Sequence, residues 1–127
     1  MILVDTSAWV EFLRDTGSAV CRRVDAELAG DLATCDVVRM EVLAGARDEA
    51  HLRALRGLLA RATDLEVRPT HYESAATLYR ACWRGGETPR RLVDCLIAAV
   101  AIDAGVGILH ADGDYEVVAR HTPLLLA

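Results

Sequence analysis

Residues 1–9 read MILVDTSAW, an apolar run that ends in a carboxylate and continues into polar residues typical of helix starts. The apolar run predicts a buried strand over residues 1–5, and either Thr6 or Ser7 is a suitable cap for a helix over residues 6–14. In an open parallel α/β sheet, groups at the carboxyl ends of strands line the crevice where ligands bind. Asp5 is therefore the first candidate functional residue.

The rest of the chain continues this alternation of short apolar runs and amphipathic segments. Further strands are predicted at residues 32–35, 65–67, 107–110 and 123–126. Helices are predicted at residues 18–29, 36–46, 48–62, 70–84, 92–104 and 115–119, with Asp36 and Thr70 as caps. The pattern predicts an α/β protein with three α/β/α layers and a central parallel sheet of four to five short strands. No linker or repeat is visible, so we expect residues 1–127 to form one domain.

The composition excludes several classes of protein. Of the 127 residues, 53% are hydrophobic, which predicts a folded core, and no apolar run reaches the ~20 residues of a membrane span. The apolar N-terminal run has no basic region before it, so we expect no signal peptide and a cytoplasmic protein. The four cysteines lack paired C-x-x-C spacing, which indicates buried thiols in a reducing compartment and no zinc site. The net charge of −5 argues against a general coat for nucleic acid, but it leaves room for a local basic site.

Four more acids interrupt apolar stretches where a surface acid is not expected. Glu41 lies within residues 37–43, Asp94 lies near the start of residues 92–100, and Asp112 and Asp114 follow the predicted strand 107–110. Burying several carboxylates together is costly unless a cation neutralises them, and oxygen ligands suit Mg²⁺ or Mn²⁺ better than zinc. Each acid also has a plainer interpretation: Asp5 as a cap, Asp94 as a partner of the helix dipole, Glu41 on a wet helix face, and Asp112 with Asp114 as a turn.

At these acids the sequence resembles the PIN-domain ribonucleases, and among them the VapC-type toxins of prokaryotic toxin–antitoxin pairs. The resemblance rests on four segments in order along essentially the whole chain: DTSAW (5–9), EVLAGA (41–46), DCLIAA (94–99) and LHADGDY (109–115). Two positions depart from the family pattern. Val38 stands where a Ser or Thr often precedes the acidic helix residue by three, and Tyr115 replaces a more usual Phe.

The resemblance implies a catalytic site of four acids, namely Asp5, Glu41, Asp94 and Asp112. It implies that Asp5, Asp94 and Asp112 hold Mg²⁺ or Mn²⁺ directly or through water, with Asp114 as a candidate fifth member. The implied reaction is metal-dependent hydrolysis of phosphodiester bonds in RNA, such as tRNA or rRNA, with one ion or two. Thr6 either touches a metal-bound water or caps its helix, and His110 is either a ligand or acid or a strand histidine beside the core.

Basic residues and partners form a second set of expectations. Arg90 and Arg91 precede Asp94 closely, and we expect them to steer the RNA backbone toward the acids, although a solvated basic loop is the alternative. The resemblance also implies a homodimer and a cognate VapB-type antitoxin, bound as a heterotetramer or larger assembly. Four features are candidates for the surface that the antitoxin covers, each of which is otherwise part of the core: Trp9, Phe12 and the helices predicted at residues 18–29 and 48–62.

Rival functions make different demands on the sequence. All fourteen basic residues are Arg, so the Lys that receiver domains and haloacid-dehalogenase-like phosphatases use near the phosphoryl group is missing. A dinucleotide-binding protein would need G-x-G-x-x-G after the first strand, and that motif is absent. The remaining alternative is a PIN-like module that binds RNA or protein without catalysis.

Overall fold

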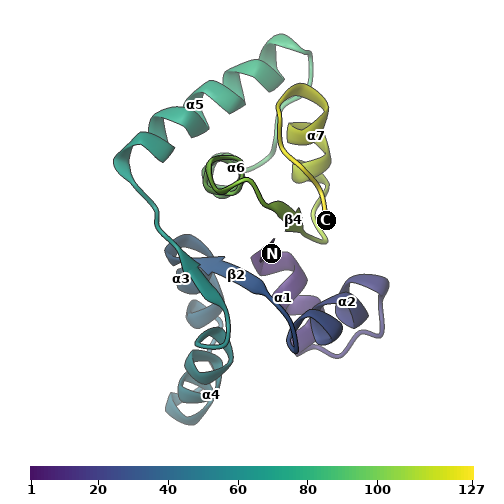
Figure 1. Cartoon of the computed structure of the whole chain (residues 1–127), viewed down its shortest axis with the longest axis vertical. Coiled ribbons are helices and arrows are strands. Elements are labelled where there is room, and N and C mark those ends of the chain that lie inside the picture. The colour runs from purple at the N-terminus through teal and green to yellow at the C-terminus, as the bar shows by residue number, and fades with distance from the viewer.

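A parallel four-stranded sheet forms the centre of the computed structural model, which describes residues 1–127 (Figure 1). The strands are β1 (Ile2–Val4), β2 (Leu32–Cys35), β3 (Thr63–Leu65) and β4 (Gly107–Leu109), and their order across the sheet is β3-β2-β1-β4. In the register of β1 with β4, Val4 pairs with Leu109, so these two strands end at the same level. The predicted α/β class and parallel sheet of four to five strands are confirmed.

Seven helices surround the sheet. They are α1 (Thr6–Leu13), α2 (Ala19–Glu27), α3 (Asp36–Ala44), α4 (Glu49–Leu59), α5 (Pro69–Arg84), α6 (Leu92–Ala104) and α7 (Gly113–His121). Helices α5, α6 and α7 pack on one another, and α1 packs on α2 and α3, so the helices form two groups that Figure 1 shows above and below the sheet. The arrangement agrees with the predicted three α/β/α layers. No helix is both long enough and apolar enough to cross a bilayer.

Helix α6 is the most buried element and carries one of the candidate acids. Its residues from Asp94 to Ala101 are all buried, because α5, α7 and β4 pack around it. A helix segment enclosed on all sides needs no polar face, which explains why residues 95–101 are all apolar. Gly105 ends the helix in the left-handed conformation, with φ of 69°, a conformation that glycine adopts without a steric penalty. The core therefore holds Asp94 in a rigid setting.

Several boundaries differ from those that the sequence predicts. The third strand spans Thr63–Leu65 and not 65–67, since its pairing with Ala33 to Cys35 of β2 selects the earlier residues. Residues 123–126 form no full strand; only a single bridge joins Leu126 to Ile108. Helix α7 is longer than the predicted 115–119, because Asp112 caps it at Gly113.

The caps of three other helices were predicted wrongly. Asp5, and not Thr6 or Ser7, caps α1 by accepting a hydrogen bond from the Ser7 N–H. Helix α3 has Cys35 as its N-cap residue, so Asp36 lies inside the first turn. Helix α5 begins at Pro69, one residue before the predicted cap Thr70, because proline fits the first turn of a helix.

Candidate functional site

The candidate acids come from four places in the chain that the parallel sheet brings to one edge. Asp5 directly follows β1, and its N–H donates to the carbonyl of Leu109 at the end of β4. Asp112 lies in the loop after β4, and Glu41 lies on α3, which begins where β2 ends. Because all four strands run in the same direction, these acids gather at the carboxyl ends of the strands.

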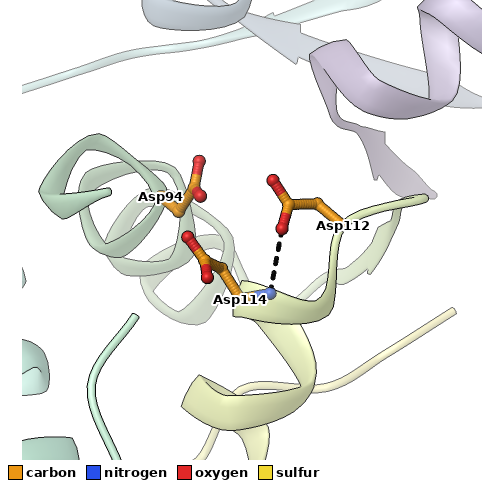
Figure 2. A group of neighbouring side chains, drawn as sticks. All are labelled: Asp94, Asp112 and Asp114. Carbon is orange, nitrogen blue, oxygen red and sulfur yellow. Dashed lines mark hydrogen bonds between the residues drawn. The ribbon is translucent and has the colours of Figure 1, made fainter. Parts of the chain in front are cut away.

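Three aspartates form the tightest cluster, and they come from α6 and the start of α7 (Figure 2). One carboxylate oxygen from each of Asp94, Asp112 and Asp114 lies within 4.8 Å of the others. Asp112 caps α7 by accepting a hydrogen bond of 3.0 Å from the Asp114 N–H, drawn as a dashed line in Figure 2. Carboxylate oxygens at this spacing are a donor set suited to a divalent cation such as Mg²⁺ or Mn²⁺.

Asp94 is the candidate acid whose negative charge is least well compensated by its surroundings. Its side chain is fully buried, and its Oδ2 has no hydrogen-bond partner. Burial raises the pKa of Asp94 to about 7, in spite of the opposing effect of the neighbouring Arg91 guanidinium. A buried carboxylate oxygen without a donor costs free energy unless a cation or proton binds it. The residues present therefore fit a divalent ion at this point.

Asp114 behaves in the opposite way, although it lies beside Asp94. Burial acts to raise the pKa of Asp114, but hydrogen bonds with Asp94 and from the backbone N–H groups of Arg90 and Arg91 outweigh it and hold the pKa below its ordinary value. Those N–H groups reach Oδ1 at 2.9 Å and Oδ2 at 3.1 Å. In the absence of a metal, Asp94 is therefore the more readily protonated carboxyl of the pair and Asp114 the more readily ionised one.

Asp5 is buried and its two oxygens are held by donors from two segments. Ser7 donates to Asp5 Oδ2 through its N–H at 2.9 Å and its hydroxyl at 2.6 Å. The Tyr115 hydroxyl donates to Asp5 Oδ1 at 2.6 Å and lies 3.3 Å from Asp94 Oδ1. Burial raises the pKa of Tyr115 well above its usual value, so the hydroxyl keeps its proton and acts as a donor. Asp5 is therefore tied to Asp94 through Tyr115.

Glu41 joins the other acids through Arg91. One guanidinium nitrogen, Nη2 of Arg91, lies 3.1 Å from Glu41 Oε2 and 2.9 Å from Asp94 Oδ1. Thr6 donates its hydroxyl to Glu41 Oε1 at 2.8 Å, so Thr6 supports this acid and does not cap α1. Glu41 and Asp94 thus face one another across Arg91, although they are far apart in the sequence.

Arg90 makes the corresponding contacts on the other side of the cluster. Its Nη2 lies 2.9 Å from Asp112 Oδ1, and its Nε lies 3.4 Å from Asp114 Oδ1. The side chain is 76% exposed, so the guanidinium also faces solvent above the acids. Both arginines that the sequence pointed to are therefore at the site, where they neutralise part of its negative charge.

A cavity of about 380 Å³ opens beside the acids and is lined by Asp5, Thr6, Ser7, Val10, Glu11, Arg91, Ala111 and Asp112. A larger cavity of about 690 Å³ lies near the opposite end of α6, around His71 and Asp103. There the His71 ring and the Arg68 guanidinium already bind the Asp103 carboxylate, so its charged groups satisfy one another. The cavity beside the acids is the one lined by candidate site residues, among them Asp5, Asp112 and Arg91.

Sequence reasoning missed two residues of the site, Ser7 and Tyr115. Ser7 lies two residues after Asp5, a spacing at which a side chain and a backbone N–H can share one carboxylate. The Ser7 hydroxyl also accepts the Ala111 N–H at 2.9 Å and so joins the ends of β1 and β4. For Tyr115, the only indication in the sequence was that it replaces the Phe more usual at this position. His110 accepts the Asp112 N–H through Nδ1 and packs on the Tyr115 ring, and no hydrogen bond joins it to Asp94 or Asp114.

Other predictions from the sequence concern the surface. Trp9 is fully buried and packs edge-on against Phe12, so the hypothesis that Trp9 forms a surface for an antitoxin is wrong. Phe12 is partly buried against the core. All four cysteines are free and buried, which confirms the prediction that they act as small hydrophobic residues.

Known proteins resemble this chain over its whole length. The family model described as PIN domain matches residues 2–121. The chain is 45% identical over 131 residues to the VapC ribonuclease Mb1587 of Mycobacterium bovis and to the ribonuclease VapC11 of Mycobacterium tuberculosis. In both comparisons the match covers 100% of this chain and 98% of the relative.

Solved structures share the fold at lower sequence identity. VapBC2 from Rickettsia felis, bound to a DNA fragment from its promoter, matches with a TM-score of 0.77 and 16% identity over 100% of this chain and 98% of that chain. VapC20 of Mycobacterium tuberculosis, a toxin that cleaves the sarcin–ricin loop, matches with a TM-score of 0.64 and 22% identity over 98% of each chain. At these identities the likeness establishes the common fold alone.

Proposed function

The chain belongs to the PIN domain family and is of the VapC type, and from this premise we propose that residues 1–127 form a single metal-dependent endoribonuclease domain, the toxin of a toxin–antitoxin pair. One observation carries the proposal most directly. Carboxylate oxygens of the buried Asp94 and Asp114 and of the partly buried Asp112 converge within 4.8 Å, and the buried Asp94 Oδ2 has no hydrogen-bond partner. Such a cluster is stable and useful when it binds a divalent cation.

The proposed catalytic residues are Asp5, Glu41, Asp94 and Asp112. Asp94 and Asp112 would hold Mg²⁺ or Mn²⁺ together with Asp114, the candidate fifth member, whose carboxylate lies in the same cluster. Asp5 would contribute directly or through a water, since both of its oxygens already accept hydrogen bonds. A bound divalent ion lowers the pKa of a water and offsets the charge on the phosphoryl group. Glu41 would add a fourth carboxylate to the catalytic set, and it faces the other acids across the Arg91 guanidinium.

Arg90, Arg91 and Thr6 are proposed to bind the substrate. Arg90 is largely exposed beside Asp112, where its planar guanidinium can form two hydrogen bonds with a phosphate group of RNA. Arg91 and Thr6 both line the cavity beside the acids, so a scissile phosphate in that cavity lies within their reach. The names of the relatives favour RNA as the substrate class, and we propose a tRNA or rRNA site.

The proposed partner is a cognate VapB-type antitoxin, as in the VapBC complexes that share this fold. A groove of about 350 Å³ between α1, α3 and α4 is lined by apolar side chains such as Val10, Leu13 and Leu55 and reaches Thr6 and Glu41. An apolar segment would fit its apolar lining and could place a basic residue at Glu41, while Arg14 and Arg47 on the same groove would face acidic or polar residues of that segment. We also propose a homodimer, joined with the antitoxin as a heterotetramer or larger, and a cytoplasmic location in which the buried thiols stay reduced.

Cleavage of RNA by the purified chain tests the proposed activity. With Mg²⁺ or Mn²⁺ and total RNA we expect discrete cuts, which mapping of the new ends locates, and no cuts when the metal is chelated. Asp5→Asn and Asp94→Asn should each abolish cutting, whereas Asp25→Asn, at an exposed position on α2, should leave it intact. RNA binding without cleavage at every metal concentration would instead support the alternative, a PIN-like module that acts by binding alone.

A further inference from the structure

The Tyr115 side chain is an aromatic residue of the core whose polar end lies among the candidate acids. The residue is fully buried on α7, and its ring packs against His110. Its hydroxyl touches Asp5 Oδ1 at 2.6 Å and Asp94 Oδ1 at 3.3 Å. A buried hydroxyl with one proton to donate thus stands between two carboxylates from different elements.

Two carboxylates brought this close repel one another, and neither belongs to the element that carries Tyr115. Asp5 follows β1 and Asp94 lies in the first turn of α6, so no local geometry sets the distance between their side chains. The short hydrogen bond to Asp5 is charge-assisted and therefore stronger than one between neutral groups. A phenylalanine at position 115 would fill the same space and leave Asp5 Oδ1 without this donor.

We propose that Tyr115 is a positioning residue for the metal site, whose hydroxyl holds Asp5 and Asp94 in the arrangement that a divalent cation requires. The inference rests on the proposed function, because it assumes that these two acids help to bind the ion. Partners that orient ligands in this way are known to change metal affinity by about 10- to 100-fold when they are removed. Tyr115 acts through the two carboxylates and touches neither the substrate nor the reacting atoms.

Calorimetric titration of the full chain with Mn²⁺ alone tests the proposal. Tyr115→Phe should bind Mn²⁺ about 10- to 100-fold more weakly than the wild type. Tyr79→Phe, which removes a phenol hydroxyl on α5 away from the acids, should leave the affinity unchanged. Cleavage by Tyr115→Phe should recover at saturating Mn²⁺, a rescue that a general loss of structure would not allow. Equal or tighter Mn²⁺ binding by Tyr115→Phe would overturn the proposal.

Asp94→Asn separates this proposal from the proposed function. If the wild type binds Mn²⁺ and Asp94→Asn does not, the proposed metal site is supported. The Tyr115→Phe titration then tests only the role of Tyr115. If the wild type binds no Mn²⁺, or if Asp94→Asn binds it equally well, both proposals fall.

A spectroscopic measurement keeps the test independent of the folding of Tyr115→Phe. The chain has three tyrosines, so Tyr72→Phe combined with Tyr79→Phe leaves Tyr115 as the sole one. Mn²⁺ should change the near-ultraviolet absorption of tyrosine in this variant, because the acceptors of its hydroxyl become metal ligands. Metal binding with no such change would overturn the role of Tyr115.

Discussion

Replacing Arg91 by Ala should destabilise the metal-free protein and make its stability depend strongly on metal. Arg91 Nη2 contacts both Asp94 Oδ1 at 2.9 Å and Glu41 Oε2 at 3.1 Å. Without the guanidinium, the fully buried Asp94 loses its charged partner, and its second oxygen already has none. Only a proton or a bound cation could then compensate its charge.

The magnitude follows from how much of the pair is buried. Removing one partner of a buried pair costs about 3–5 kcal/mol, whereas an exposed pair contributes about 0–1 kcal/mol. Asp94 is inaccessible but the Arg91 side chain is 47% exposed, so water screens part of the interaction. We therefore expect a loss of about 2 kcal/mol in the free energy of unfolding, which corresponds to a Tm lower by about 8 °C for a chain of this size.

Thermal unfolding at a pH above about 7, where Asp94 is ionised, measures this effect when it is run without metal and with saturating Mn²⁺. The loss should shrink when Mn²⁺ is present, because the cation then neutralises the carboxylate that Arg91 served. Arg120→Ala is the matched control: it removes an arginine that pairs with Glu87 away from the acids, so its effect should be smaller and independent of metal. A drop in Tm for Arg91→Ala that is no larger than this control and unchanged by Mn²⁺ would refute the reasoning.

Two further predictions concern pH and packing. Because the pKa of Asp94 is raised to about 7 in the folded chain, its proton favours folding at low pH, and the metal-free protein should lose stability as pH rises from about 4 to about 7. The same proton competes with the ion for Asp94, so Mn²⁺ affinity should rise between about pH 4 and about pH 7 and level off above about pH 7. Denaturant unfolding at several pH values measures the stability, and calorimetry at the same pH values measures the affinity. A stability or an affinity that does not change with pH would contradict the corresponding prediction. Gly85→Ala should cost about 1–2 kcal/mol, since a Cβ there would lie 2.3 Å from the His121 ring and push it from Glu87. The control Gly57→Ala, where nothing lies within 4 Å, should stabilise α4 by about 0.5–1 kcal/mol; equal effects of the two variants in denaturant unfolding would contradict the packing argument.

Local patterns in the sequence were sufficient to predict much of the fold. The apolar runs before Asp5 and before Asp112 predicted the two strands whose ends now lie side by side. The strongly apolar character of residues 92–104, interrupted by Asp94 and Asp103, predicted a helix, and α6 has those same boundaries. Strands and buried helices are predictable in this way because each depends on side chains close together in the chain.

Contacts between residues that are far apart in the sequence could not be predicted from local patterns. Residues 65–67 alternate as a strand should, but the pairing with β2 selects Thr63–Leu65 instead. Arg90 and Arg91 were predicted to steer RNA, and although Arg91 lies only three residues before its partner Asp94, nothing local indicated the pairing of Arg90 with Asp112 or of Arg91 with Glu41. The role of the Tyr115 hydroxyl required the position of α7 against β1, which only the folded chain provides.

The position of β1 between β2 and β4 affects how the chain folds while it is being synthesised. Strand β1 is made from the first residues of the chain, yet one of its two neighbours is β4, near the other end. During synthesis β1 therefore emerges well before the strand that pairs with it, and pairings between such distant segments form slowly. Asp94 and Asp112 also follow β1 by a long stretch of chain, so a nascent chain that stops before them lacks two of the acids that we propose to bind the metal.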